Sequence, residues 1–156
     1  MPAEIERKFL VRDDSWRQQA GPGNPYRQGY FGGTRRASIR VRISGDEGRL
    51  NIKSMTLGVE RQEYEYPVPV DEAREMLDTL CERPFVEKVR YEVPVGDHVW
   101  EVDVFEGDNA GLVVAEVELN DPDEAFEMPA WAGEEVSHDP KYYNINLVKH
   151  PYRAWK

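Results

Sequence analysis

The sequence has few of the residues that form disulfides or soft-metal sites. Among its 156 residues there are one cysteine and three histidines, which are Cys81, His98, His138 and His150. A single cysteine excludes an internal disulfide and is typical of a reducing compartment. Scattered histidines do not form the clustered ligand set of a zinc site. We therefore expect a cytoplasmic protein without disulfides.

Long apolar runs and excess positive charge are also missing. No apolar run approaches the length of a membrane-spanning helix, and the N-terminus lacks the apolar stretch of a secretory signal. The formal net charge of −10 argues against general nucleic-acid binding, which needs a basic surface to contact phosphates. We expect neither a membrane nor a nucleic acid as partner. A local basic pocket for a small phosphate compound remains compatible with this charge.

The remaining composition is that of a globular protein with many turns. Apolar residues make up 40% of the chain and charged residues 32%, with 11 prolines and 12 glycines. The length is sufficient for one hydrophobic core. We expect a single domain over residues 1–156.

Charged residues recur at every second position in most strand-like segments. In the first segment, Glu4, Glu6 and Lys8 share one face of a strand, and Ile5 and Phe9 lie on the other. The same alternation, bounded by turn residues, predicts eight mostly antiparallel strands over residues 3–11, 26–31, 37–44, 49–55, 59–68, 85–95, 99–106 and 112–119.

Two helices are expected between and after these strands. Asp71 can cap a helix with an apolar stripe for packing on a sheet, formed by Ala73, Met76, Leu77 and Leu80. The segment 121–124, Asp-Pro-Asp-Glu, has the cap, proline and acidic residue of a second helix start. The tail from residue 131 onward shows no regular pattern.

Charged faces on nearly every strand need a common place to point. A closed eight-stranded antiparallel barrel provides one, with a charged interior and apolar faces packed outward under a few helices. This would be a mainly β protein of the α+β class. The alternative is an open antiparallel sheet with one solvated, charged face.

The residues expected on the inner face form an acidic and a basic set. The acids are Glu4, Glu6, Glu63, Glu65, Glu92, Glu101, Asp103, Glu116 and Glu118. The bases are Lys8, Arg40, Arg42, Lys53, Arg61, Lys88 and Arg90. Paired bases suit an oligo-anion because arginine forks grip phosphate oxygens, and paired acids suit a hard divalent cation. Burying a charged group costs free energy, so ion pairs inside a barrel add little net stability. Keeping so many charged groups inside therefore indicates that they bind a ligand.

These motifs, in this order, resemble the triphosphate tunnel metalloenzyme family of the CYTH superfamily, and in particular its small bacterial inorganic triphosphatases. The similarity extends over almost the whole chain and rests on Glu4-x-Glu6-x-Lys8, Arg40-Val41-Arg42, Lys53, Glu63-Tyr64-Glu65, Lys88-Val89-Arg90-Tyr91, Asp103, Glu116-Val117-Glu118, Gly133-Glu134-Glu135-Val136 and Tyr142-Tyr143-Asn144.

The resemblance implies a role for each group of residues. The metal ligands, for Mg²⁺ or Mn²⁺, would be Glu4, Glu6, Glu116 and Glu118. The triphosphate would be bound by Arg40, Arg42, Lys53, Lys88 and Arg90. Catalytic roles would belong to Lys8, the inward lysine of the first strand, and to Glu63, Glu65 and Asp103, which would orient these bases or help to hold a second metal. The resemblance does not say whether Lys141, Tyr142 or Tyr143 reaches the tunnel.

The expected activity is metal-dependent hydrolysis of inorganic triphosphate to diphosphate and phosphate. The alternatives are an adenylyl cyclase of the class IV type, a nucleoside or thiamine triphosphatase, and a non-catalytic module that binds polyphosphate. Only Phe105 and Tyr30 are candidates to contact a nucleobase, so a bare triphosphate is favoured. The sequence leaves open whether the chain forms a homodimer.

Overall fold

The computed structural model describes residues 3–32, 35–55 and 59–155. Its strands are β1 (Ala3–Val11), β2 (Asn24–Tyr30), β3 (Ala37–Ser44), β4 (Glu47–Ser54), β5 (Glu60–Val68), β6 (Val86–Val95), β7 (His98–Phe105), β8 (Val113–Leu119) and β9 (Ala132–Glu135). The helices are α1 (Val70–Thr79) and α2 (Asn144–Lys149). Short 3-10 helices span Ser15–Gln18, Gly107–Asn109, Pro140–Tyr142 and Tyr152–Ala154.

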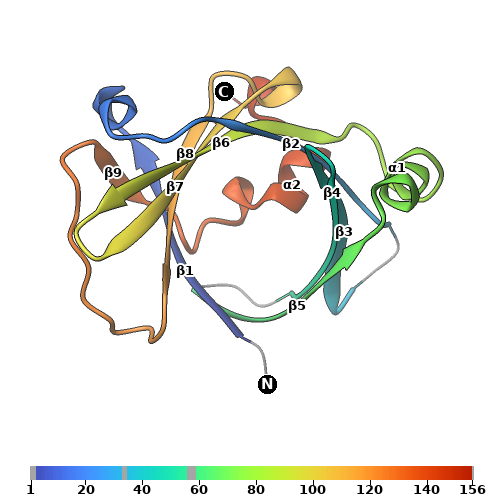
Figure 1. Ribbon diagram of the computed structural model, residues 1–156, viewed down its shortest axis with the longest axis horizontal. Coiled ribbons are helices and arrows are strands. Elements are labelled where there is room, and N and C mark those ends of the chain that lie inside the picture. The colour runs from blue at the N-terminus through green and yellow to red at the C-terminus, as the bar shows by residue number, and fades with distance from the viewer. Residues whose placement is uncertain (1–2, 33–34, 56–58, 156) are drawn as a thin grey trace.

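The strands form the closed antiparallel barrel that the charge alternation predicted (Figure 1). The strand order is β5-β4-β3-β2-β6-β7-β8-β1, and β5 pairs with β1 to close the ring. This closing seam is short, because β5 pairs only with residues 3–5 of β1. Further along the same edge, β1 pairs with β9, a short strand that the sequence did not predict.

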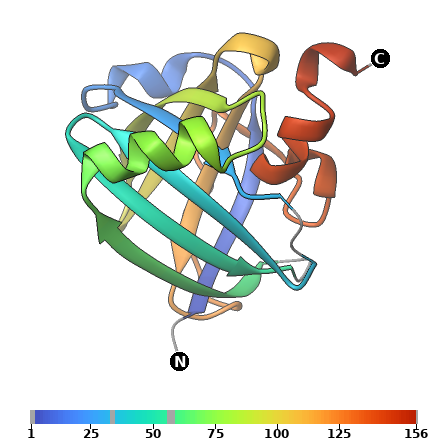
Figure 2. The same cartoon turned by 90° about the vertical axis from the view of Figure 1, so that its right-hand side faces the viewer.

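Most of the apolar core lies outside the barrel. Trp100, which is fully buried, points outward from β7 and packs against Phe126 and Trp131 of the long β8–β9 connection. On the opposite wall, Val41 packs against Ala73 and Leu77 of α1, and Figure 2 shows α1 lying across the strands. This outward packing leaves the inner faces of the strands to polar side chains.

Two details of the helices differ from the prediction. Helix α1 begins at Val70 after Pro69, without a side-chain cap from Asp71, and Leu80 is 57% exposed instead of packed on the barrel. The segment 121–124 forms a turn, not a helix. In that turn the Asp121 carboxylate accepts a hydrogen bond from the Asp123 amide at 2.8 Å, so its side chain is used locally.

Helix α2 and the segment around it close one mouth of the barrel (Figures 1 and 2). Leu147 and Val148 pack with inward-facing Val86, Phe105 and other residues into an apolar plug. The C-terminal segment is tied down by a hydrogen bond of 2.8 Å from the Tyr152 amide to Asn109 Oδ1. Among the described helices, none has the length and apolar character needed to cross a lipid bilayer. The barrel is therefore a cup with a charged interior above an apolar floor.

Candidate active site

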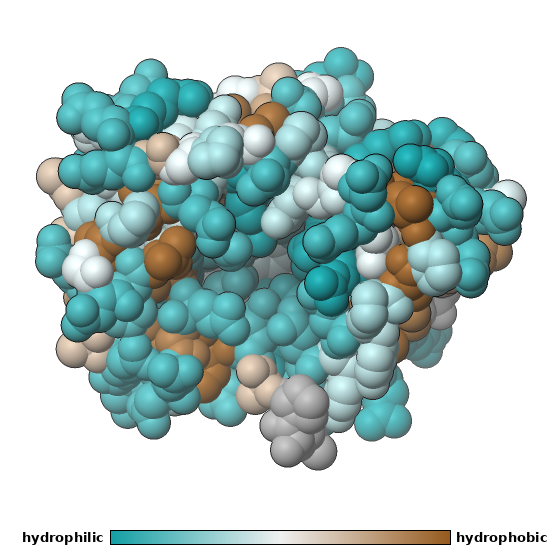
Figure 3. Space-filling view, in the orientation of Figure 1, coloured by the Kyte–Doolittle hydropathy of each residue, from teal (hydrophilic) through white to brown (hydrophobic). Residues whose placement is uncertain are grey.

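The interior of the barrel holds a cavity of about 280 Å³. Figure 3 shows a hollow lined by hydrophilic residues at the mouth opposite α2. All the predicted site residues except Asp103 line this cavity. Acidic and basic side chains contribute in equal number, and they are Glu4, Glu6, Glu63, Glu65, Glu101, Glu116, Glu118, Lys8, Arg40, Arg42, Lys53, Arg61, Lys88 and Arg90.

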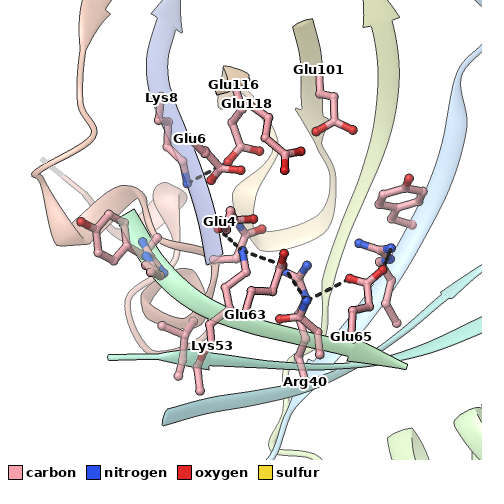
Figure 4. A pocket seen from close by; sticks show the side chains of 18 of the residues that line it. Glu4, Glu6, Lys8, Arg40, Lys53, Glu63, Glu65, Glu101, Glu116 and Glu118 are labelled. Carbon is pink, nitrogen blue, oxygen red and sulfur yellow. Dashed lines mark hydrogen bonds and ion pairs between the residues drawn. The ribbon is translucent and has the colours of Figure 1, made fainter. Parts of the chain in front are cut away.

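The predicted metal ligands come together on two neighbouring strands. The β1–β8 register places Glu6 opposite Glu118 and Lys8 opposite Glu116. Figure 4 shows the carboxylates of Glu6, Glu116 and Glu118 gathered near that of Glu4. Because side chains two apart in a strand share a face, the register is sufficient to build this cluster. An all-oxygen, all-carboxylate donor set of this kind fits a hard divalent cation.

Two of these carboxyl groups affect each other's ionisation. A hydrogen bond links the side chains of Glu6 and Glu116, and burial, followed by the charges of Glu116 and Glu4, raises the pKa of Glu6 well above its usual value. Burial opposes ionisation of Glu116 as well, but Lys8, the hydrogen bond from Glu6 and Arg90 hold its pKa well below the usual value. A cation that enters this cluster would therefore compete with a proton at Glu6.

The predicted phosphate-binding side chains lie on the facing wall. Arg40 and Arg42 extend from β3, Lys53 from β4, and Lys88 and Arg90 from β6. Within the described residues, no protein group accepts the proton of the buried Arg40 Nε. A buried donor without a partner is costly, and an anion in the cavity would satisfy it.

Asp103 lies beneath the basic wall and not on the cavity surface. It is 1% exposed, and its carboxylate accepts hydrogen bonds from Lys88 Nζ at 2.8 Å and from Arg90 Nε and Nη2 at 2.8 and 2.9 Å. Burial alone would raise the pKa of Asp103, but the charges of Arg90 and Lys88 outweigh it and lower that pKa. Burial also lowers the pKa of Lys88 to about 8 despite this contact. Asp103 is placed to orient both bases, not to contact a ligand.

Asn51 holds the two acids that β5 contributes to the cavity. Its side-chain amide donates hydrogen bonds of 2.9 Å to both Glu63 Oε2 and Glu65 Oε2. Asn51 is 2% exposed, so the two carboxylates are held from below by a buried group. Lys53 Nζ lies 3.0 Å from Glu4 Oε1 and 3.9 Å from Glu63 Oε2, and so connects this pair to the candidate metal ligands.

The family model for the CYTH domain matches residues 2–152 of the chain. The chain belongs to the CYTH domain family. An inorganic triphosphatase of Acetivibrio thermocellus is 48% identical to it over 156 residues, which are 100% of this chain and 99% of the relative. An inorganic triphosphatase of Nitrosomonas europaea is 40% identical over 149 residues, or 93% of this chain and 96% of the relative. A solved structure of an inorganic triphosphatase has 39% identity and a TM-score of 0.65, covering 92% of this chain and 96% of that chain.

The cavity of this CYTH domain includes tail residues that the sequence did not assign. Tyr143, Asn144 and Ile145 line it from the closed end, and Lys141 does not. Asn144 Oδ1 accepts hydrogen bonds from Gln28 Nε2 at 3.1 Å and Lys88 Nζ at 3.4 Å. The Tyr142 side chain is not in the lining, but its carbonyl accepts a hydrogen bond of 3.2 Å from Lys8 Nζ. The only signal for these contacts was the Tyr142-Tyr143-Asn144 match to the family.

Three other residues that the sequence placed in the interior are Glu92, Phe105 and Tyr30. Glu92 shares the inner-face parity of β6 but is exposed and does not line the cavity of the CYTH barrel. Phe105 does point inward, yet it is 3% exposed and packs in the plug with α2 instead of forming a slot for a nucleobase. Tyr30 packs in the same plug and also lines the cavity. The alternation of side chains along a strand predicted which face of the sheet each residue lies on. It did not predict how deeply the residue lies in the barrel.

Proposed function

We propose that the protein hydrolyses inorganic triphosphate to diphosphate and phosphate with the help of Mg²⁺ or Mn²⁺. The observation that carries this proposal is the meeting of a carboxylate cluster and a five-member basic wall in one small cavity. A short polyanion with its metal complements both halves of such a cavity. The full-length similarity to proteins named inorganic triphosphatases supports the same substrate.

The carboxylates of Glu4, Glu6, Glu116 and Glu118 would hold the metal. A divalent cation bound there would neutralise charge on the phosphate oxygens as the phosphorus–oxygen bond breaks. Hard divalent cations prefer oxygen ligands, and these four carboxylates supply only oxygen atoms. Lys8, which lies 3.7 Å from Glu116, would keep that ligand ionised and aimed at the cavity.

The basic wall would hold the phosphate chain in line for the reaction. Arg40, Arg42, Lys53, Lys88 and Arg90 would grip the phosphate oxygens and stabilise the negative charge that gathers on the leaving diphosphate. A water attacks the terminal phosphorus, and no covalent enzyme intermediate is needed.

The acids of the other walls would act through the bases or on the water. We propose that Asp103 orients Lys88 and Arg90 from below. Glu63 and Glu65, held by Asn51, would order the attacking water or balance the charge of Lys53 and Arg42.

The test is to incubate the protein with inorganic triphosphate, ATP or thiamine triphosphate in the presence of Mg²⁺ or Mn²⁺ and to separate the products. We expect diphosphate and phosphate in equal amounts from triphosphate, and none without a divalent cation. Cyclic AMP and diphosphate from ATP would identify a cyclase. Tight binding of triphosphate without product would identify a non-catalytic module and overturn the proposal.

A further inference from the structure

Strand β2 separates the two basic strands of the cavity wall and carries no charge on its inner face. In the sheet, β2 lies between β3, which bears Arg40 and Arg42, and β6, which bears Lys88 and Arg90. The positions of β2 on the same face as these bases are Asn24, Tyr26, Gln28 and Tyr30, and Asn24 is exposed. Four of the five bases of the wall are therefore two pairs of cations with an uncharged strand between them.

The ring of Tyr26 fills the space between these pairs at the cavity surface. Its centroid lies 4.7 Å from Arg42 Cζ, 5.2 Å from Arg90 Cζ and 6.0 Å from Lys88 Nζ. These distances are those of cation–π contacts. One aromatic ring thus contacts a guanidinium group from each of the two neighbouring strands, and it lines the cavity itself.

The two arginines differ in how much other support they have. Arg90 forms ion pairs with Asp103, Glu101 and Glu116. Arg42 forms one ion pair within the part of the chain that the structure describes, at 3.8 Å from Glu65. Burial and the neighbouring charge of Arg40 lower the pKa of Arg42. Arg42 is therefore the member of the wall that depends most on Tyr26 for its position.

We propose that Tyr26 is a positioning residue for triphosphate binding, whose ring holds Arg42 beside Arg90 so that both guanidinium groups face one phosphate chain. This inference rests on the proposed function. An aromatic face attracts a cation without neutralising it. A carboxylate in the same place would compete with phosphate for the arginine forks. The ring therefore positions the two guanidinium groups without adding another carboxylate that would compete with the ligand.

The test compares Tyr26→Leu, which removes the ring, with Tyr26→Phe, which removes only the hydroxyl group. We expect Tyr26→Leu to raise the KM for inorganic triphosphate about fivefold or more, as suits the loss of a partly desolvated cation–π contact, with a much smaller change in kcat. Tyr26→Phe should retain the wild-type KM. Tyr66→Leu is the matched control, because Tyr66 is 53% exposed on β5 and lies outside the cavity.

A double mutant separates positioning of Arg42 from general damage to the wall. If Tyr26 acts through Arg42, then Tyr26→Leu should add little to the effect of Arg42→Ala, because the two changes remove one interaction. Additive effects would overturn the proposal, and so would a Tyr26→Phe variant as impaired as Tyr26→Leu, since the hydroxyl group would then be the contact. A melting temperature for each variant identifies any loss of fold.

The same variants are titrated calorimetrically with inorganic triphosphate without added metal, where no turnover occurs. This measurement separates the two proposals. A wild-type protein that binds triphosphate but does not hydrolyse it would refute the proposed function, and the titrations would still decide the role of Tyr26. An active wild-type protein with an unchanged Tyr26→Leu variant would refute the role of Tyr26 alone.

Discussion

Lys53 Nζ lies 3.0 Å from Glu4 Oε1, so a base of the predicted phosphate wall and a predicted metal ligand are paired with each other. Both side chains are nearly buried, at 12% and 11% exposed. A buried ion pair is strongly destabilised when one partner loses the other. A cation that recruits Glu4 would leave Lys53 with only its longer contact of 3.9 Å to Glu63, and an anion that recruits Lys53 would take Glu4 away from its paired base.

This pairing predicts that metal and triphosphate bind synergistically. Each ligand supplies the counter-charge that the other displaces, so each should raise the affinity for the other by the same factor. We expect the dissociation constant of a non-hydrolysable triphosphate analogue, measured by titration calorimetry, to be at least tenfold smaller at saturating Mg²⁺ than in EDTA. Metal-free triphosphate is itself a stronger anion than its Mg²⁺ complex, so simple attraction to the basic wall predicts the reverse order. Equal affinities would contradict the coupling.

Loss of one carboxylate in the metal cluster should stop turnover without unfolding the protein. Glu4→Gln and Glu6→Gln keep the side-chain shape but remove a predicted metal ligand. Activity at saturating Mg²⁺ should fall at least about a hundredfold, because changes to the outer-shell partners of metal ligands already cost about 10–100-fold. Circular dichroism should show an intact fold in both variants. The melting temperature should stay close to wild type for Glu6→Gln and fall for Glu4→Gln, which removes the nearest counter-charge of Lys53. Near-normal rates in both variants would remove these residues from the metal site.

The affinity for metal should rise with pH above the range in which ordinary glutamates titrate. The pKa of Glu6 is raised, so the protonated carboxyl persists to higher pH and competes with the cation. Binding of Mn²⁺ should therefore release a proton and weaken as the pH falls through the raised pKa. Calorimetry in buffers of different ionisation enthalpy measures this proton. The Glu6→Gln protein should release less, and an equal release would assign the proton to another group.

Removing Arg40 should weaken substrate binding without loss of stability. Arg40→Ala eliminates a charge-assisted phosphate contact worth about 1.5–3 kcal/mol, so the KM for triphosphate should rise at least about tenfold. The melting temperature should stay the same or rise, because a buried donor without a partner is removed. Arg74→Ala is the control, since Arg74 lies on α1 with 57% of its side chain exposed. An unchanged KM would place Arg40 outside the substrate site.

The cavity should favour bare triphosphate over nucleotides. Its lining is predominantly charged, and Phe105 is packed in the plug, so binding energy should come from the phosphates. We expect kcat/KM for inorganic triphosphate to exceed that for ATP at least tenfold, with little cyclic AMP formed. Chromatography of the products against time measures both quantities. ATP turned over as efficiently as triphosphate would indicate a general nucleotidase.

The barrel could be predicted because its signal is repeated. Charges such as Glu116 and Glu118 recur with a period of two on strand after strand, and a closed ring is the arrangement that lets all of them face one space. The register of β1 with β8 then brings the acids together without any further information.

The parts that could not be predicted lack such a period. Strand β9 spans only Ala132–Glu135, and α2 spans six residues whose order comes from packing of Leu147 in the plug. Isolated helices of this length are unstable in water, so their sequence carries little signal. The helix that was wrongly predicted at Asp121 has a different cause. An aspartate side chain that accepts a backbone hydrogen bond occurs both at the start of helices and in turns.

The plug formed by α2 also determines how molecules move through the site. In the described part of the chain α2 covers one mouth, so substrate and products would pass through the opposite opening, and the last fragment to enter would be the first to leave. The product nearer the opening would leave first. The product beside Tyr143 and Asn144 would leave last and would prevent the next substrate from binding until then. Where the chemical step is fast, departure of that inner fragment sets the pace of turnover.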